Sequence, residues 1–149
     1  MNRRQKAILA EVATVISVTL IAVVGMINFK DYVNRSEAIS AMQQLSRIIA
    51  DYRSKNGGVP PSSAVMEVKN KLKGGARLAG LRYRGLWIEF DSGPDTILAY
   101  AAKRYPASLL SDGYVVLLLD GTVKWEEKEQ FEKTLAEQQS DIEIEMSRQ

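Results

Sequence analysis

The fold is decided by one uncharged apolar stretch, Val12-Ala-Thr-Val-Ile-Ser-Val-Thr-Leu-Ile-Ala-Val-Val-Gly-Met-Ile-Asn-Phe29. When it is extended back to Ala7, this stretch is interrupted only by Glu11. In a helix that rises about 1.5 Å per residue it reaches roughly 35 Å, which is enough to cross the hydrocarbon core of a bilayer. We therefore predict that residues 1–29 form a short N-terminus and a transmembrane anchor.

The charges on either side of this stretch predict its orientation. Basic residues precede it at Arg3, Arg4 and Lys6, whereas basic and acidic residues are mixed after it. Because positively charged flanks stay in the cytoplasm, we expect a cytoplasmic N-terminus and a C-terminal part on the other side of the membrane. A cleavable secretory signal is the alternative, but the apolar run is long for one and no small-x-small site follows it. We predict an uncleaved signal anchor that makes a single pass.

Helical periodicity continues beyond the apolar stretch. Apolar residues recur at spacings of three and four, which mark one face of an amphipathic helix: Ala38, Ala41, Met42, Leu45, Ile48, Ile49 and Tyr52. Asn56-Gly57-Gly58 favours a left-handed termination, and Pro60-Pro61 prevents the helix from resuming. The pattern predicts one helix from about Ala7 to Lys55, in which residues 30–56 form an amphipathic stem.

Residues 57–139 have the pattern of a small α+β head. A short helix is predicted over Ala64–Lys73, capped by Ser62-Ser63. Four apolar or alternating segments then predict strands: Leu86–Asp91, Thr96–Ala101, Tyr114–Leu119 and Thr122–Trp125. Tyr114–Leu119 is expected to be central because both of its faces are apolar. Asp120-Gly121 is a hairpin signal, since both positions favour positive φ.

The C-terminal segment predicts one more helix and then a flexible end. Glu126–Gln139 looks helical, with Phe131 and Leu135 facing inward, and we expect residues 140–149 to be a flexible tail. Three or more strands need a packing partner in water, so the stem is expected to cover one face of the sheet. The predicted fold class is α+β, with a long N-terminal helix packed on a small antiparallel sheet of three or four strands.

The composition narrows the possible chemistry. The 149-residue chain contains no cysteine and no histidine, which excludes Ser-His-Asp and Cys-His catalysis, and no phosphate-binding loop is present. A net charge of +2 is too small to indicate a nucleic-acid partner. We predict a non-enzymatic protein without a cofactor. A loop calcium site is the alternative, because oxygen ligands suit that ion; its candidate ligands are Asp91, Asp95, Asp112 and Asp120.

Charge is unevenly spread along the head. A basic stretch without acidic residues contains Lys69, Lys71, Lys73, Arg77, Arg82 and Arg84, whereas Glu126 to Glu145 is mainly acidic. One interpretation is that these segments form two solvated faces. The other is that a basic surface on one subunit meets an acidic surface on its neighbour.

Three local features occur in an order that is typical of one family. A basic N-terminus leads into a hydrophobic helix with a glutamate near its start, Glu11, and the helix leaves the apolar stretch through Ile27-Asn28-Phe29. Leu45–Ser62 then joins stem to head, and Gly113–Trp125 reads strand, Asp-Gly, strand. In this order of parts the chain resembles type IV pilins and the pseudopilins of type II secretion systems.

The resemblance implies a pilin-like structural protein of a bacterial inner membrane, with a cytoplasmic N-terminus and a periplasmic or extracellular head. It also implies self-association or pilin-like partner subunits, packed through the N-terminal helix. Glu11 and Gly25 are the expected assembly residues, since glycine allows close helix approach. The chain departs from the family at Ala7-Ile8-Leu9-Ala10, which lacks the glycine of the processing site, and at Met26-Ile27, which replaces the exit proline. The alternative is a monomeric membrane-tethered binding module of the same architecture.

Overall fold

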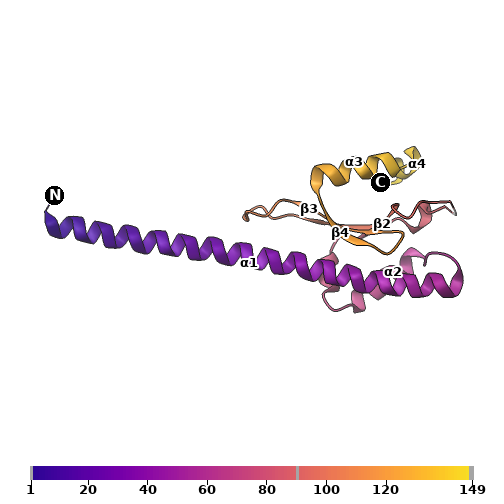
Figure 1. Cartoon of the computed structure of the whole chain (residues 1–149), viewed down its shortest axis with the longest axis horizontal. Helices are drawn as coiled ribbons and strands as arrows, with labels where there is room; N and C mark the ends of the chain where they lie inside the picture. Colours follow the sequence, from indigo (N-terminus) through magenta and orange to yellow (C-terminus); the bar gives the residue numbers. More distant parts are fainter. Residues whose placement is uncertain (1, 90, 148–149) are drawn as a thin grey trace.

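The computed structural model describes residues 2–89 and 91–147 and has the predicted α+β class (Figure 1). Its helices are α1 (Arg3–Asn56), α2 (Ser62–Lys71), α3 (Lys128–Gln138) and α4 (Asp141–Ser147), with 3₁₀ turns η1 (Gly75–Leu78) and η2 (Gly85–Trp87). Its strands are β1 (Arg82–Tyr83), β2 (Ile97–Lys103), β3 (Gly113–Leu118) and β4 (Val123–Glu127). They form one antiparallel sheet in the order β1-β2-β3-β4.

Helix α1 runs without interruption through the apolar stretch and the stem, as predicted. It begins a few residues earlier than expected because Asn2 caps it and exchanges hydrogen bonds with the first turn, including one from its N–H to Gln5 Oε1 (2.9 Å). At the other end Gly57 adopts a left-handed φ of 74°, and its N–H donates to the carbonyl of Arg53 (2.8 Å). The Asn-Gly-Gly termination signal is therefore confirmed.

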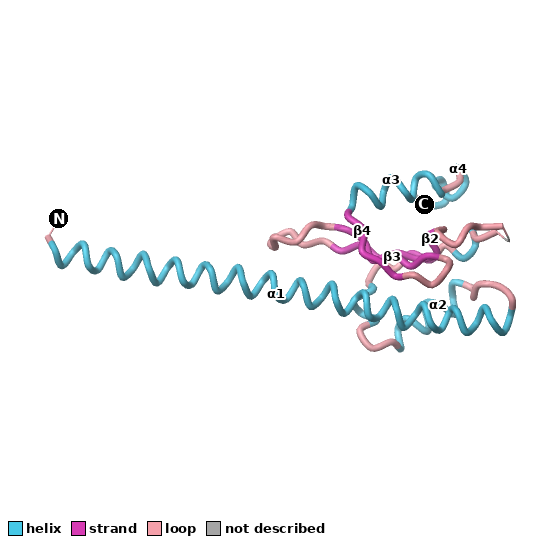
Figure 2. The backbone as a smooth tube through the Cα atoms, in the orientation of Figure 1, coloured by secondary structure: helices cyan, strands magenta, loops and turns pink. Residues whose placement is uncertain are grey.

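The head, which we define as residues 57–147 with the stem packed on them, has three layers (Figures 1 and 2). The second half of α1, together with α2, covers one face of the sheet, and α3 covers the other. Strand β3 lies between β2 and β4, which confirms its predicted central place. Its side chains alternate between the two layers: Val115 and Leu117 pack toward α1, whereas Tyr114, Val116 and Leu118 pack toward α3.

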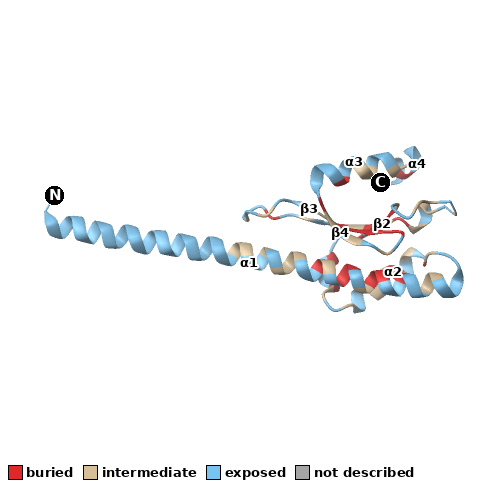
Figure 3. Cartoon of the chain, viewed as in Figure 1, coloured by how far each residue is buried: buried red, intermediate tan, exposed pale blue. Residues whose placement is uncertain are grey.

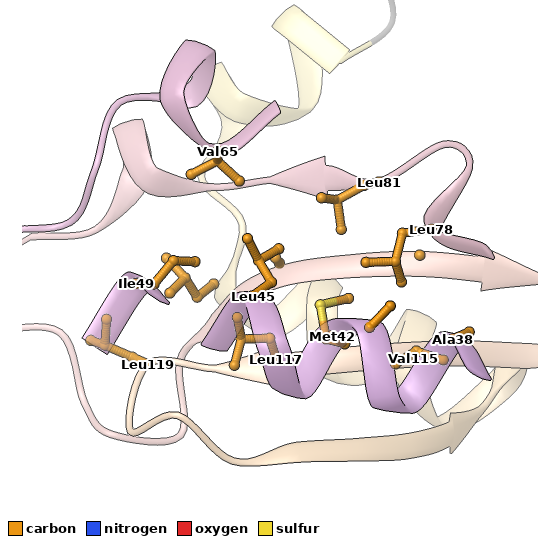
Figure 4. Close-up of a cluster of buried hydrophobic side chains, with 14 residues drawn as sticks. Ala38, Met42, Leu45, Ile49, Val65, Leu78, Leu81, Val115, Leu117 and Leu119 are labelled. Carbon is orange, nitrogen blue, oxygen red and sulfur yellow. The ribbon is translucent and has the colours of Figure 1, made fainter. Parts of the chain in front are cut away.

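The core between α1 and the sheet is built from one stripe of α1 (Figure 4). The buried residues of that stripe are Ala38, Ala41, Met42, Leu45, Ser46 and Ile49. They pack against β3 and against three apolar side chains from the segment between α1 and the sheet, Val65, Leu78 and Leu81. The predicted docking of the stem on the sheet is confirmed. Ile48, which the predicted stripe includes, is exposed.

Helix α3 closes the opposite face of the sheet. The ring of Phe131 is fully buried and stacks on Tyr114 with ring centroids 3.9 Å apart. It also packs against Tyr100 at 4.9 Å, and Leu135 lies one turn further along the same cluster. The predicted inward face of this helix is confirmed, although the helix begins at Lys128 because β4 extends to Glu127.

The predicted strand over Leu86–Asp91 is wrong. After the two-residue strand β1 the chain turns into η2, where the N–H of Trp87 donates to the carbonyl of Arg84 (2.8 Å). At this point the N–H of Arg84 still donates to the carbonyl of Leu98 in β2 (2.8 Å), while its side chain pairs with a buried carboxylate. Leu86 is left 83% exposed, whereas Ile88 of the same alternation is partly buried against the core, so the two side chains do not share one buried face. Phe90, which belongs to the same prediction, lies outside the described residues.

The structure has a helix in the segment, residues 140–149, that the sequence predicts to be a flexible tail. Asp141–Ser147 forms α4. Glu143 of this helix is 5% exposed and forms an ion pair with Arg84, which is 4% exposed. The tail is therefore docked on the head through a contact between residues that are 59 positions apart.

The β3–β4 hairpin uses the predicted turn residues in a different geometry. The N–H of Leu118 donates to the carbonyl of Thr122 (2.9 Å), and the N–H of Gly121 donates to the carbonyl of Leu118 (3.0 Å), so the loop has three residues. Gly121 has a φ of 94°. The expectation of positive φ at Asp120 is wrong, since among the described residues only glycines have it. The Asp120 carboxylate instead accepts the N–H of Thr122 (2.7 Å).

Replacing Gly121 by alanine is expected to lower the free energy of unfolding by about 1–2 kcal/mol, because a Cβ is strained at this left-handed φ. The added Cβ also lies 3.3 Å from Ser46 Oγ, whose hydroxyl donates to the Gly121 carbonyl (2.7 Å). Urea unfolding of the full chain in detergent measures the loss. Gly58→Ala is the control, since its added Cβ meets no described atom within 4 Å and its φ is not left-handed. Equal losses in the two variants would contradict this account.

Candidate membrane anchor and head cleft

The first half of α1 projects away from the head and leaves its side chains exposed (Figure 3). Its large apolar side chains from Ile8 to Phe29 are between 46% and 73% exposed, except Ile27, which is partly buried. In the described part of the chain, α1 is the one helix that is long and apolar enough to cross a membrane. An apolar surface of this extent is unfavourable in water and favours lipid or a protein partner. Residues 3–29 of α1 are therefore a candidate membrane anchor.

Glu11 places a single carboxylate within this apolar surface. It is exposed, and among residues 2–89 and 91–147 its side chain has no hydrogen-bond or ion-pair partner. A carboxylate inside hydrocarbon is unfavourable unless a partner or water stabilises it. In an inserted helix, Glu11 therefore requires either the headgroup region or a group from another molecule.

Gly25 lies in α1 without distorting it. A Cβ at this position would meet no described atom within 4 Å, so the fold of one chain does not require glycine here. The hydroxyls of Thr14, Ser17 and Thr19 each donate to the carbonyl four residues earlier at 2.8 Å. These hydroxyls are satisfied inside the helix and need no second helix. Gly25 thus permits close helix packing, whereas the hydroxyls do not demand it.

The anchor meets the head at Asn28. Its Oδ1 accepts hydrogen bonds from Ser108 Oγ (2.9 Å) and from the N–H of Leu109 (2.8 Å). Further along α1, the Arg35 guanidinium lies over the ring of Trp125, 3.6 Å from its centroid. The head is therefore attached to α1 from residue 28 onward, well before the buried stripe begins.

An open cleft of about 320 Å³ lies on the head beside α4. Its walls include Leu86, Trp87, Tyr100 and Met146, arranged around the Arg84–Glu143 pair. Arg84 donates from Nε and Nη2 to the two Glu143 carboxylate oxygens at 2.6 and 2.8 Å. It also donates from Nη1 and Nη2 to the carbonyls of Ile97 and Gln138 at 2.8 and 3.0 Å. The guanidinium is already satisfied, so it fastens α4 to β2 instead of offering a free cation to the cleft.

The four aspartates of the predicted calcium site do not form one site. Asp91 and Asp95 lie in the turn before β2, whereas Asp112 precedes β3 and Asp120 follows its far end. The N–H and the hydroxyl of Thr122 both donate to Asp120 and hold the pKa of its carboxyl below the ordinary value. In the described residues, no group of three or more acidic side chains is placed to hold a metal ion. Asp120 is thus a turn residue.

Part of the basic stretch is neutralised within the chain. Arg84 pairs with Glu143, and Arg77 Nε donates to Glu37 Oε2 of α1 (2.7 Å). The first pair joins the basic stretch to the acidic C-terminal segment of the same molecule. Arg84 is therefore not available for the contact between subunits that is one interpretation of the charge pattern, whereas the Arg77–Glu37 pair remains about half exposed at the surface.

The sequence located the anchor but not the Arg84–Glu143 pair or the contact at Asn28. The apolar side chains of the tail give no signal for this pair, because Ile142 and Met146 are exposed and the buried residue is the charged Glu143. The Asn28 contact joins residues 81 positions apart and uses a backbone N–H, which leaves no pattern in the sequence.

Comparisons of the chain with protein-family models, with curated proteins and with solved structures found no match.

Proposed function

We propose that the chain is a non-enzymatic, single-pass membrane protein of pilin-like or pseudopilin-like architecture. Its N-terminus lies in the cytoplasm, the apolar part of α1 crosses a bacterial inner membrane, and the head lies on the periplasmic or extracellular side. The exposed half of α1 packs laterally against neighbouring subunits, as part of a secretion- or pilus-type assembly.

The difference in burial between the two halves of α1 is the observation that supports this proposal. Its second half buries a stripe beneath the sheet, whereas its first half stays exposed although it is more apolar. The same helix therefore builds the head with one half and offers the other half to lipid and to neighbours. The basic residues before the anchor support the orientation, because such residues are retained in the cytoplasm.

One face of the anchor favours packing between subunits. At about 100° per residue, Glu11, Ala22 and Gly25 fall on the same side of α1, whereas Leu20 falls on the opposite side. The small residues allow a second backbone to come close. The unpaired Glu11 carboxylate on this face is stabilised if a neighbour supplies a cation or a hydrogen-bond donor. We call the side of α1 that carries these three residues the Glu11 face.

A monomeric membrane-tethered binding module is the second candidate function. The hydroxyls of the anchor favour it, because they are satisfied within α1 and need no neighbouring helix. The open cleft beside α4 also favours it, because a ligand surface on the head requires no assembly.

Cross-linking in membranes tests the proposal. The natural chain has no cysteine, so a single Ala22→Cys substitution reports only on contacts of the Glu11 face. We expect oxidation of membranes to give disulfide-linked dimers of Ala22→Cys, and several-fold fewer when Glu11→Leu is added, because the polar contact between helices is lost. Glu11→Gln, which keeps hydrogen-bonding groups, is expected to retain more of the dimer.

Leu20→Cys is the matched control, since it lies on the opposite side of the same helix. Equal yields from Ala22→Cys and Leu20→Cys would contradict packing through the Glu11 face and would favour the monomeric tether. Release of the protein by a carbonate wash would contradict the anchor itself.

A further inference from the structure

One segment of the head reaches back along α1 to the end of the apolar stretch. The β2–β3 loop, residues 104–112, leaves the sheet and extends toward the N-terminal half of α1 (Figures 1 and 2). Its tip is held by the two hydrogen bonds to Asn28 Oδ1, from the hydroxyl of Ser108 and the N–H of Leu109. Asn28 is itself held in place, because its Nδ2 donates to the carbonyl of Val24 (2.8 Å).

The base of this loop is equally well defined. Lys103 and Gly113 are paired across β2 and β3, and the buried Tyr105 donates its N–H to Asp112 Oδ1 (2.6 Å). The N–H of Ser108 donates to the carbonyl of Tyr105 (3.1 Å) and closes a turn within the loop. Since both the base and the tip are bonded, the level of the tip along α1 is set by the fold.

That level is the outer end of the candidate anchor. Asn28 is the penultimate residue of the uncharged stretch, and Lys30 and Asp31 are the first charged residues after it. Phe29 and Tyr32 expose their rings at the same height of α1. Aromatic side chains in this position are typical of the membrane–water interface.

The loop has the composition of a segment that enters this interface. Residues 105–111 carry no charge, and the flanking Arg104 and Asp112 supply charges only at its base. Leu109 at the tip is 87% exposed. A single exposed leucine is ordinary on a protein surface, but this one is fixed at the height where the apolar stretch ends.

We propose that the β2–β3 loop is a second membrane contact of this protein. Leu109, together with Phe29 and Tyr32, enters the boundary between head groups and acyl chains in the leaflet on the head side. The occupant of this surface is the lipid of the same bilayer that holds α1. The loop and α1 then contact the membrane at two points, so the head is held against the lipid surface. This inference rests on the proposed membrane span.

The position of the loop favours lipid over a protein partner. A tip that is bonded to residue 28 of α1 faces lipid head groups whenever the apolar stretch is inserted, whether or not a second protein is present. Insertion of one leucine with neighbouring aromatic rings also matches the amphipathic character of the interface.

Depth-dependent quenching in vesicles tests this inference. The full chain is reconstituted in phosphatidylethanolamine–phosphatidylglycerol vesicles, and an environment-sensitive fluorophore is attached to the single cysteine of Leu109→Cys. We expect its emission to shift to shorter wavelength, and its quenching by lipids brominated at shallow acyl positions to be several-fold stronger than that of the control.

The control is the same label on Leu86→Cys. Leu86 is exposed to a similar extent, but it follows Tyr83, whose hydroxyl donates to the carbonyl of Pro60 beyond the C-terminal end of α1. It therefore lies at the far end of the head from the membrane. Equal lipid quenching at Leu109 and Leu86 would overturn the inference. A short-wavelength emission at Leu109 without lipid quenching would also overturn it, because a protein would then cover the loop.

A third label separates this inference from the proposed span. Leu20 lies eight residues deeper in the apolar stretch than Asn28, so a label on Leu20→Cys is quenched by lipids brominated deep in the acyl chain whenever α1 is inserted. Quenching at Leu20 and at Leu109 supports both proposals. Quenching at Leu20 alone overturns the loop contact and leaves the anchor in place, whereas no quenching at Leu20 overturns both.

Discussion

Arg84→Met is expected to lower the free energy of unfolding of the head by about 3–5 kcal/mol, because it leaves the buried Glu143 carboxylate without its counter-ion. The substitution also removes the hydrogen bonds that Arg84 donates to the carbonyls of Ile97 and Gln138. Helix α4 is then expected to detach from β2. Urea unfolding of the full chain in detergent micelles, followed by tryptophan fluorescence, measures the change.

A second arginine–glutamate pair provides the matched control. Arg77 Nε contacts Glu37 at 2.7 Å, but both side chains are about half exposed. Arg77→Met is therefore expected to cost less than about 1 kcal/mol, as exposed ion pairs contribute little. The double variant Arg84→Met, Glu143→Leu should recover most of the loss, because no unpaired charge remains buried. If Arg84→Met costs no more than Arg77→Met, the pair does not fasten α4.

Phe131→Ala is expected to cost about 3–5 kcal/mol, since it empties the centre of the apolar layer between α3 and the sheet. The ring stacks on Tyr114 and packs against Tyr100, and it is covered further by Leu135. Without it, α3 loses the buried side chain that holds it to the sheet. The same urea titration in detergent measures the loss of stability.

Leu86→Ala is the control that shows whether the loss of stability in Phe131→Ala comes from removing a buried side chain or from removing any apolar side chain. Leu86 is apolar but exposed, so its truncation is expected to change stability by less than about 0.5 kcal/mol. A loss comparable to that of Phe131→Ala would mean that η2 is packed against another part of the chain. A small loss for Phe131→Ala would mean that α3 does not close the second face of the sheet.

The parts of the fold that were predicted correctly are those with a strong local period. Helix α1 follows from apolar residues repeated at three and four positions, and its end follows from Gly57, whose left-handed φ ends the helix. Strand β3 was predicted from an apolar run whose alternate side chains can pack into the layers on both faces of the sheet. In the candidate site, the apolar half of α1 was predicted from the sequence because a helix that could span a membrane is recognised by length and composition alone. The assembly roles of Glu11 and Gly25 stay predictions.

The segments around Leu86–Asp91 and Glu143 were not placed from the sequence for one shared physical reason. The apolar alternation over Leu86–Asp91 resembles a strand, but the side chain of the adjacent Arg84 pairs with Glu143 of α4, and the chain forms η2 directly after Arg84. The acidic segment around Glu143 resembles a solvated tail for the same reason. Arg84 and Glu143 are 59 positions apart, so their pairing produces no periodic pattern in the sequence of either segment. The position of each segment therefore could not be predicted without knowing the position of the other.

Local periodicity and charge therefore specify a long helix with an apolar half, a stem with one buried face, and a small antiparallel sheet. These properties depend on residues that are close together in the chain. Each residue adds its own contribution to the free energy of forming the helix or strand, or of inserting the helix into a membrane. The docking of α4 and the height of the β2–β3 loop on α1 arise only when distant segments pack together. Each depends on a few directed hydrogen bonds, from Arg84 to Glu143 and from the loop to Asn28, which exist only once the layers are in register.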